Sequence, residues 1–187
     1  MIPDSAPFRH GQAGEIQRVL QQAFTDDHQY LLQGGDRTRL GWMPFQVADF
    51  VAIMTEVMAV TDGVRFLEVG SGIGTKMLVA AHLFGLTTEG IEFSEELAAV
   101  SAKRRCTPVY VCDALHWAGN YGDYDIVWMY RPFRDEELQA QLEQRIYSEM
   151  KPGAVLAGAA LQNPPPSDWE IVVDDFDMGN RGAWKKA

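Results

Sequence analysis

The stretch of sequence that decides the fold runs Phe66-Leu67-Glu68-Val69-Gly70-Ser71-Gly72-Ile73-Gly74-Thr75-Lys76-Met77-Leu78. Its apolar start predicts a short strand over 66–69, and the apolar residues that return from Met77 at helical spacing predict a helix. The three glycines between them are typical of a sharp turn, because glycine adopts unusual φ/ψ values without steric cost. A helix that begins there directs its free N–H groups toward the crevice beyond the strand. The stretch therefore predicts a ligand site built on loop backbone.

The spacing of the glycines narrows the choice of ligand. Dinucleotide sites usually read G-x-G-x-x-G, whereas this chain has Gly70-x-Gly72-x-Gly74 followed by Thr75. This departure disfavours a nicotinamide dehydrogenase but keeps it as a rival hypothesis. Glu68 stands at the end of the predicted strand, where a carboxylate can approach a cationic ligand. An ordinary glycine-rich turn between a strand and a helix is the structural alternative.

Residues 68–74 resemble the E/D-x-G-x-G-x-G signature of class I, Rossmann-like S-adenosylmethionine-dependent methyltransferases. The resemblance extends over about residues 44–161. It implies an α/β fold with a doubly wound, mostly parallel sheet, and S-adenosyl-L-methionine as the cofactor. The ammonium and sulfonium of that cofactor explain an acid beside the loop. The cofactor-binding candidates in this stretch are Glu68, Gly70, Ser71, Gly72 and Gly74.

A second acid agrees with the glycine loop. Residues 89–93 predict a short strand, and Glu92 follows the loop by about 20 residues, the separation at which Rossmann-type sites hold a ribose. A carboxylate at this position can accept hydrogen bonds from both ribose hydroxyls. We therefore predict that Glu92 and its neighbour Phe93 bind the cofactor. The alternative for Glu92 is a solvent-facing residue at the end of a strand.

The third predicted strand, residues 108–112, leads into Asp113 and Ala114. The family resemblance implies that Asp113 accepts a hydrogen bond from the adenine amino group and that the next backbone N–H donates to a ring nitrogen. His116 is the histidine beside a predicted loop at this edge, so it is a catalytic candidate as general base for an amine or hydroxyl acceptor. A structural role for His116 is the alternative.

The fourth predicted strand and its exit, residues 123–133, end in Tyr130-Arg131-Pro132-Phe133. The resemblance implies that this end faces the methyl group and the acceptor. Some family members carry Asn/Asp-Pro-Pro-Tyr/Phe here to bind an exocyclic amine, and the departure from that motif argues against methylation of a base amine. Tyr130 and Arg131 are the acceptor-side catalytic candidates, and Arg131 suits an anionic acceptor. A purely structural role for both is the alternative.

Ahead of the glycine loop, residues 1–60 predict an N-terminal helical extension. Helices are expected over about 12–32 and from Pro44 onward. The resemblance implies that such helices fold over the cofactor as a lid, while packing against the core is the alternative. The candidate lid contacts are Arg37, Arg39, Trp42 and Gln46.

The predicted cofactor-binding core spans residues 61–161, and the C-terminal part that follows it, residues 162–187, is short. Leu138, Leu142, Ile146 and Met150 recur at four-residue spacing and predict a helix, and residues 154–161 predict a strand buried on both faces. Residues 162–168 contain three consecutive prolines and cannot supply a crossover helix. Residues 169–175 and about 182–186 are therefore expected to pair as antiparallel edge strands.

Composition limits the partners. The 187 residues suit a single domain, and 16 Lys and Arg against 26 Asp and Glu give a net charge of −10, which disfavours nucleic acid as the acceptor. Cys106 and Cys112 show neither metal-site nor disulfide spacing. The absence of a leader-like or membrane-spanning run predicts a cytoplasmic protein without a membrane partner. The oligomeric state cannot be predicted.

Together, these observations predict a methyltransferase that uses S-adenosyl-L-methionine and acts on a small-molecule or protein acceptor. The alternative is a non-catalytic protein that binds S-adenosylmethionine or S-adenosylhomocysteine in a retained pocket.

Overall fold

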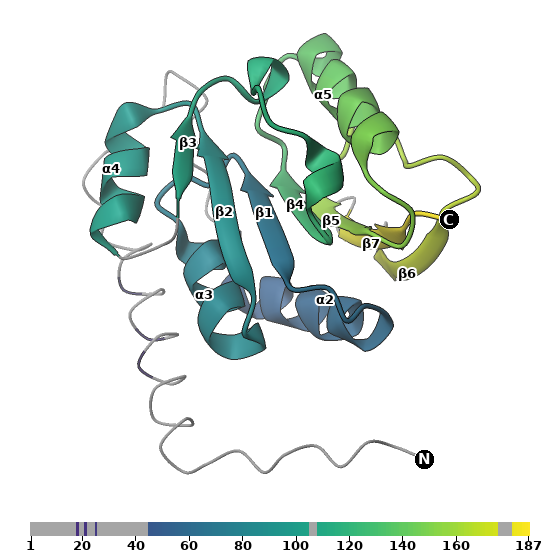
Figure 1. Cartoon of the computed structure of the whole chain (residues 1–187), viewed down its shortest axis with the longest axis horizontal. Coiled ribbons are helices and arrows are strands. Elements are labelled where there is room, and N and C mark those ends of the chain that lie inside the picture. Colours follow the sequence, from purple (N-terminus) through teal and green to yellow (C-terminus); the bar gives the residue numbers. More distant parts are fainter. Residues whose placement is uncertain (1–17, 19–20, 22–24, 26–44, 105–107, 176–180) are drawn as a thin grey trace.

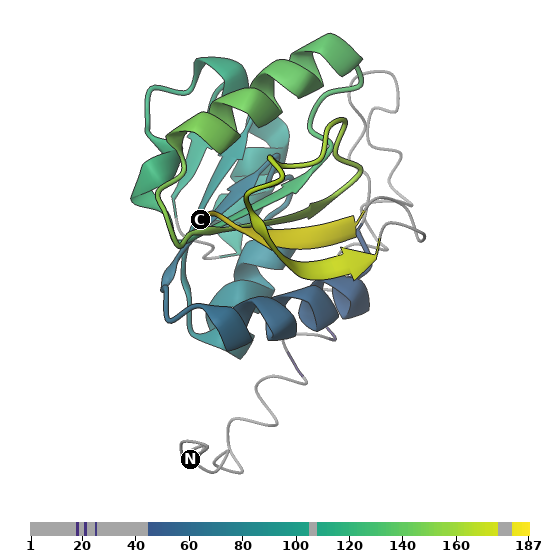
Figure 2. The ribbon, with the colours of Figure 1, turned by 90° about the vertical axis from the view of Figure 1, so that its right-hand side faces the viewer.

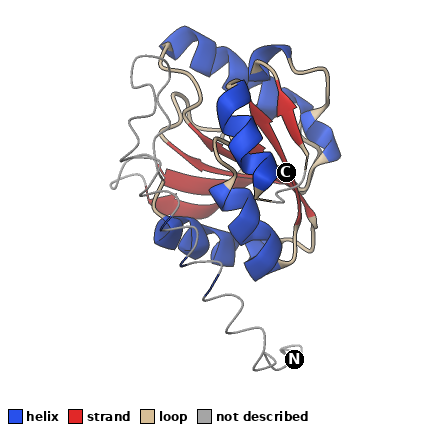
Figure 3. Cartoon of the chain, turned by 90° about the vertical axis from the view of Figure 1, so that its left-hand side faces the viewer, coloured by secondary structure: helices blue, strands red, loops and turns tan. Residues whose placement is uncertain are grey.

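The computed structural model describes residues 18, 21, 25, 45–104, 108–175 and 181–187. These form one seven-stranded sheet in the order β3-β2-β1-β4-β5-β7-β6 (Figures 1 and 3). The strands are β1 (Arg65–Val69), β2 (Thr87–Glu92), β3 (Val109–Val111), β4 (Ile126–Tyr130), β5 (Val155–Ala159), β6 (Glu170–Asp175) and β7 (Arg181–Lys185). The first five are parallel, so the predicted doubly wound, mostly parallel fold is confirmed.

Helices cover both faces of the sheet. They are α2 (Val47–Val60), α3 (Thr75–Phe84), α4 (Glu95–Lys103) and α5 (Glu136–Glu149), with the single-turn helices η1 (Ala114–His116) and η2 (Tyr121–Asp123). Figure 2 shows α2 and α3 on one face and α5 on the other. A separate apolar layer lies between each face of the sheet and the helices that cover it, because alternate strand residues point to opposite faces. Phe66 and Trp128 lie in the layer under α2 and α3, and Leu67 and Met129 lie in the layer under α5.

The two C-terminal strands differ in one respect from the prediction. They pair antiparallel as expected, but β7 lies between β5 and β6, so of these two strands β6 alone lies at an edge of the sheet. The chain from β5 therefore passes over the position next to that strand, forms β6 at the edge, and returns as β7 between the two. The connection between β5 and β6 contains no described helix.

The buried side of α5 also differs from its four-residue apolar spacing. Leu142, Ile146 and Met150 are buried, whereas Leu138 is 38% exposed. The polar Gln139 and Glu143 are fully buried instead. Polar side chains at buried positions need hydrogen-bond partners, and these are found in the loops around the site.

The described residues test the predictions for the N-terminal part only in part. The helix predicted from Pro44 begins at Val47, preceded by the exposed Gln46. Most of the helix expected over 12–32 lies outside the described residues, as do Arg37, Arg39, Trp42 and Cys106. Within the described ranges, no helix combines the length and the apolar character that crossing a membrane requires.

Candidate functional site

The glycine loop joins β1 to α3 and adopts the backbone that the sequence predicted. Gly70, Gly72 and Gly74 have φ angles of 74°, 55° and 77°, in the left-handed region that glycine occupies readily. The backbone N–H groups of Gly70 and Ser71 both donate to the carbonyl of Ile91, each at 2.9 Å. The end of β2 therefore anchors the loop of β1.

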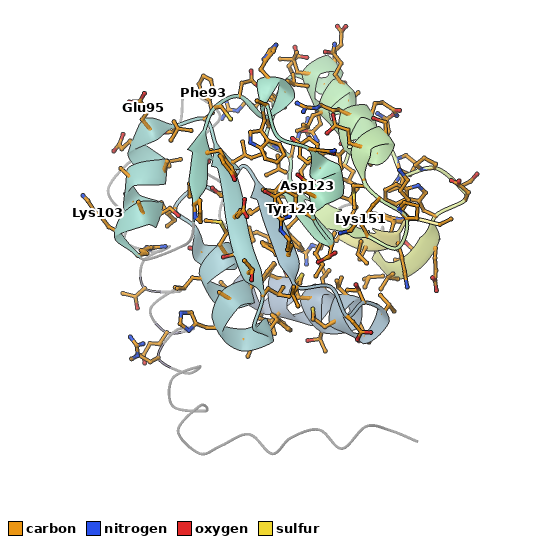
Figure 4. The ribbon with its side chains drawn as sticks, in the orientation of Figure 1. Phe93, Glu95, Lys103, Asp123, Tyr124 and Lys151 are labelled. Carbon is orange, nitrogen blue, oxygen red and sulfur yellow. The ribbon has the colours of Figure 1, made fainter. Side chains whose placement is uncertain are left out.

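Glu92 ties the two predicted cofactor elements together. Its Oε2 accepts a hydrogen bond from the N–H of Gly72 at 2.7 Å, and its Oε1 accepts one from the N–H of Ser94 at 2.8 Å. Burial raises the pKa of this carboxyl group above its ordinary value. The next side chain, Phe93, is 70% exposed and lies beside the start of α4, close to Glu95 (Figure 4). An acid and an exposed ring thus adjoin the glycine bend.

Glu68 lies beneath the loop and is fully buried. The ammonium of Lys76, on α3, lies 3.0 Å from its Oε1, but neither carboxylate oxygen makes a hydrogen bond with any described residue. Burial raises the pKa of Glu68 to about 7, although Lys76 opposes this shift. The buried hydroxyl of Ser71 also lacks a hydrogen-bond partner among the described residues. Glu68 Oε2 and the Ser71 hydroxyl are therefore buried at the glycine bend without a hydrogen bond from a described residue, whereas Oε1 has the Lys76 ammonium as its ion-pair partner.

Lys76 was not predicted as part of this site. The only signal in the sequence is its position in the first turn of a helix, where a basic residue opposes the helix dipole. A cation placed there needs a nearby anion, and Glu68 supplies it.

Asp113 follows β3 at the same edge of the sheet. The N–H of Cys112 donates to the carbonyl of Glu92 at 3.0 Å, which brings the exits of β2 and β3 side by side. Asp113 Oδ1 accepts from the N–H of Leu115 at 2.9 Å, and its Oδ2 lies 3.4 Å from Nδ1 of His116. Ala114 is buried, whereas the His116 side chain is 81% exposed. The four residues therefore form one turn beside Glu92.

Tyr130 and Arg131 end β4, the strand next to β1. A Cβ atom on Gly70 would lie 3.3 Å from Cβ of Pro132, so the exit of β4 adjoins the glycine loop. The Tyr130 ring packs edge-on against Phe45, with 5.2 Å between ring centres. Arg131 has a φ of 35°, a strained value for a residue with a side chain. Such strain at a strand exit is typical of functional sites.

The three catalytic candidates do not form one cluster. Tyr130 and Arg131 leave β4, whereas His116 leaves β3, and both β2 and β1 lie between these strands. The ion pair recorded for His116 is with Asp113. The role of His116 as a base therefore stays a prediction.

The sequence did not predict the α5 side chains that bind the segments after β4 and β5. Glu143, on α5, accepts from the N–H of Gln162 at 2.7 Å, from the N–H of Asn163 at 2.8 Å and from the amide of Gln139 at 2.8 Å. Gln139 in turn accepts from the N–H of Phe133 at 3.2 Å. One helix therefore ties down the exits of both β4 and β5.

Comparisons with known proteins agree with this arrangement. A family model described as protein-L-isoaspartate(D-aspartate) O-methyltransferase matches residues 45–110. A solved structure of phosphoethanolamine N-methyltransferase 2 from Haemonchus contortus, in complex with phosphomonomethylethanolamine and S-adenosylhomocysteine, is 27% identical with a TM-score of 0.51. The match covers 62% of this chain and 28% of that enzyme. No curated protein sequence matched.

Two further solved structures show the same fold at lower identity. An RNA methyltransferase from Salinibacter ruber, in complex with S-adenosyl-L-homocysteine, is 16% identical with a TM-score of 0.60, and 76% of this chain matches 93% of it. CalS10, an amino pentose methyltransferase from Micromonospora echinaspora, is 18% identical with a TM-score of 0.54, and 72% of this chain matches 66% of it.

The chain therefore has the class I, Rossmann-like methyltransferase fold. Together with the glycine loop, the matches support the predicted assignment to the class I S-adenosylmethionine-dependent methyltransferases.

Proposed function

We propose that this protein binds S-adenosyl-L-methionine and transfers its methyl group to a small-molecule or protein acceptor. The observation that carries the proposal is the 2.7 Å hydrogen bond between Gly72 and Glu92. It joins the glycine bend to the acid that ends the second strand, at the carboxyl edge of the parallel strands, where α/β folds bind nucleotides.

The residues present fit this cofactor. Both oxygens of Glu92 accept backbone hydrogen bonds, and a carboxylate has further lone pairs that can accept from a ribose hydroxyl. The exposed Phe93 ring provides an apolar surface for a base. Glu68, buried under the loop beside the Lys76 ammonium, places a carboxyl group close to where a cationic methionine tail would lie.

The cofactor would supply a methyl group already activated by its sulfonium. The chain's own part would be to bind and orient the reactants and to exclude water. The methionine tail would lie along the loop residues Gly70, Ser71, Gly72 and Gly74. The adenine would form hydrogen bonds with Asp113 and Ala114. Tyr130 and Arg131, beside Gly70 through Pro132, would face the acceptor.

The guanidinium of Arg131 favours an acceptor with a carboxylate or phosphate, because it can donate two parallel hydrogen bonds to such a group. His116 would take a proton from a neutral amine or hydroxyl acceptor only if the acceptor reaches across from the exit of β4 to that of β3. The net charge of −10 argues against a nucleic-acid acceptor.

Calorimetry with S-adenosylhomocysteine and with NAD tests the cofactor. We expect binding of S-adenosylhomocysteine and none of NAD, and the reverse result would contradict the proposal. Transfer of label from methyl-labelled cofactor to a panel of anionic metabolites and peptides then tests the acceptor class. Binding without transfer to any compound of a broad panel would favour the non-catalytic alternative.

A further inference from the structure

Arg145, on α5, holds the loop after β3 by its backbone. Its Nη1 donates to the carbonyls of Ala114 at 3.3 Å and Leu115 at 2.9 Å. Its Nη2 donates to the carbonyls of Trp117 at 2.8 Å and Gly119 at 3.1 Å. Four carbonyls from one short segment thus converge on a single guanidinium.

The rest of the guanidinium is held equally firmly. Its Nε donates to Oε1 of Glu149 at 2.8 Å, while Oε2 of Glu149 accepts from the N–H of Tyr121 at 3.2 Å. The Arg145 guanidinium carbon lies 5.2 Å from the centre of the Tyr121 ring, and the Tyr121 hydroxyl donates to the carbonyl of Ala114 at 3.1 Å. All five N–H groups of Arg145 therefore have an acceptor. Lysine cannot reproduce this planar fork.

The loop that Arg145 gathers carries the proposed adenine contacts. Ala114 presents its carbonyl to Arg145, and its N–H is the group expected to donate to the purine ring. The carboxylate of Asp113 is oriented by the N–H of Leu115, whose own carbonyl also binds Arg145. The directions of both recognition groups therefore depend on the turn that the guanidinium holds.

We propose that Arg145 is a positioning residue for base recognition. By fixing the carbonyls of residues 114–119, it aligns the Asp113 carboxylate and the Ala114 N–H for an adenine and against a 6-oxopurine. This inference rests on the proposed cofactor site and adds to it the residue that sets its selectivity for the base.

The test compares S-adenosylhomocysteine with S-inosylhomocysteine by calorimetry. The inosine form replaces the amino group by a carbonyl and the unprotonated ring nitrogen by an N–H. The Asp113 carboxylate would then face another acceptor, and the Ala114 N–H would face another donor. The unaltered protein should prefer S-adenosylhomocysteine by at least about tenfold. Arg145→Lys keeps the charge but loses the fork, and should lower both the affinity and the preference by about tenfold.

Lys186→Met provides a matched control. The Lys186 ammonium also binds backbone carbonyls, those of Tyr147 at 2.8 Å and Met150 at 2.6 Å, but these lie at the C-terminal end of α5 and not in the loop after β3. Its loss should lower the melting temperature while both dissociation constants stay unchanged. A general loss of rigidity would instead alter the preference in both variants.

Unchanged affinity and preference in Arg145→Lys would overturn this inference, while binding of S-adenosylhomocysteine would still support the proposed function. Failure of the unaltered protein to bind S-adenosylhomocysteine would overturn the proposed function itself. If Arg145→Lys does not fold, Tyr121→Phe decides, because it removes only the hydroxyl that binds Ala114. A fall of about threefold in preference would support the inference, and no fall would overturn it.

Discussion

Two fully buried glutamates mark the difference between the two halves of the sheet. Glu143, in the half that contains β4 and β5, accepts hydrogen bonds from Gln139, Gln162 and Asn163. Glu68, in the half that contains β1–β3, has only the ion pair with Lys76 and no hydrogen bond from a described residue. A satisfied buried carboxylate stabilises the loops around it, whereas one without hydrogen-bond donors lowers the stability of the fold. We therefore propose that Glu143 stabilises the fold and that Glu68 contributes to ligand binding.

The largest expected effect is that of Glu143→Ala on stability. The substitution leaves the Gln139 amide and the N–H groups of Gln162 and Asn163 without their acceptor, so the free energy of unfolding should fall by about 3–5 kcal/mol. Urea unfolding measures this change. Gln144→Ala, at an exposed neighbouring position, should change it by less than about 0.5 kcal/mol. A loss below about 1 kcal/mol for Glu143→Ala would remove the distinction between the two glutamates.

The second prediction concerns pH. Because the pKa of Glu68 rises from 4.5 to about 7 on folding, the folded protein retains a proton in this window that the unfolded chain has released. The contribution of Glu68 to the free energy of unfolding should therefore fall by about 3 kcal/mol as the pH rises through this window, and level off above it. Glu68→Gln should lack this fall. Parallel pH profiles of the two proteins in urea unfolding would show that Glu68 titrates normally.

Glu92→Ala should weaken the binding of the ligand, and it should also lower stability because the N–H groups of Gly72 and Ser94 lose their acceptor. Loss of the carboxylate removes two ribose contacts, so the affinity for S-adenosylhomocysteine should fall by about 10- to 100-fold in calorimetry. Glu95→Ala, an exposed position at the start of α4, should leave the affinity unchanged. An unaltered dissociation constant in Glu92→Ala would rule out the ribose role.

The smallest expected effect is that of alanine at Gly70. Comparison with alanine at Gly85 distinguishes a change in the ligand-binding loop from the general cost of placing a side chain at positive φ. Gly70 and Gly85 have φ angles of 74° and 70°, so alanine at either position should cost about 1–2 kcal/mol of stability. Only Gly70→Ala should also weaken the binding of S-adenosylhomocysteine, because Gly85 closes α3 away from the glycine bend. Equal affinities in the two variants would place the ligand elsewhere.

The half of the sheet around β1–β3 could be predicted because its signals are local. Gly70 to Gly74 follow β1 directly and Glu92 ends β2. Because the fold brings the carboxyl ends of parallel strands together, the adjacency of these residues in space followed from their positions in the chain. The buried contacts around β4 and β5 could not be predicted. Glu143 lies 19 residues before Gln162, and nothing in the apolar spacing of α5 indicates that a glutamate is buried there.

By itself, the sequence determined the glycine bend, the order of strands and helices in the core, and the acids at the carboxyl ends of β1 and β2. These depend on the conformational freedom of glycine and on apolar periodicity, which act over a few residues. Only the tertiary structure decided that β7 separates β5 from β6, that Lys76 pairs with Glu68, and that Arg145 and Glu143 hold the loops of the site. These choices depend on which buried polar groups meet once the chain has folded, because a buried donor or acceptor takes its partner from whatever packing brings within reach.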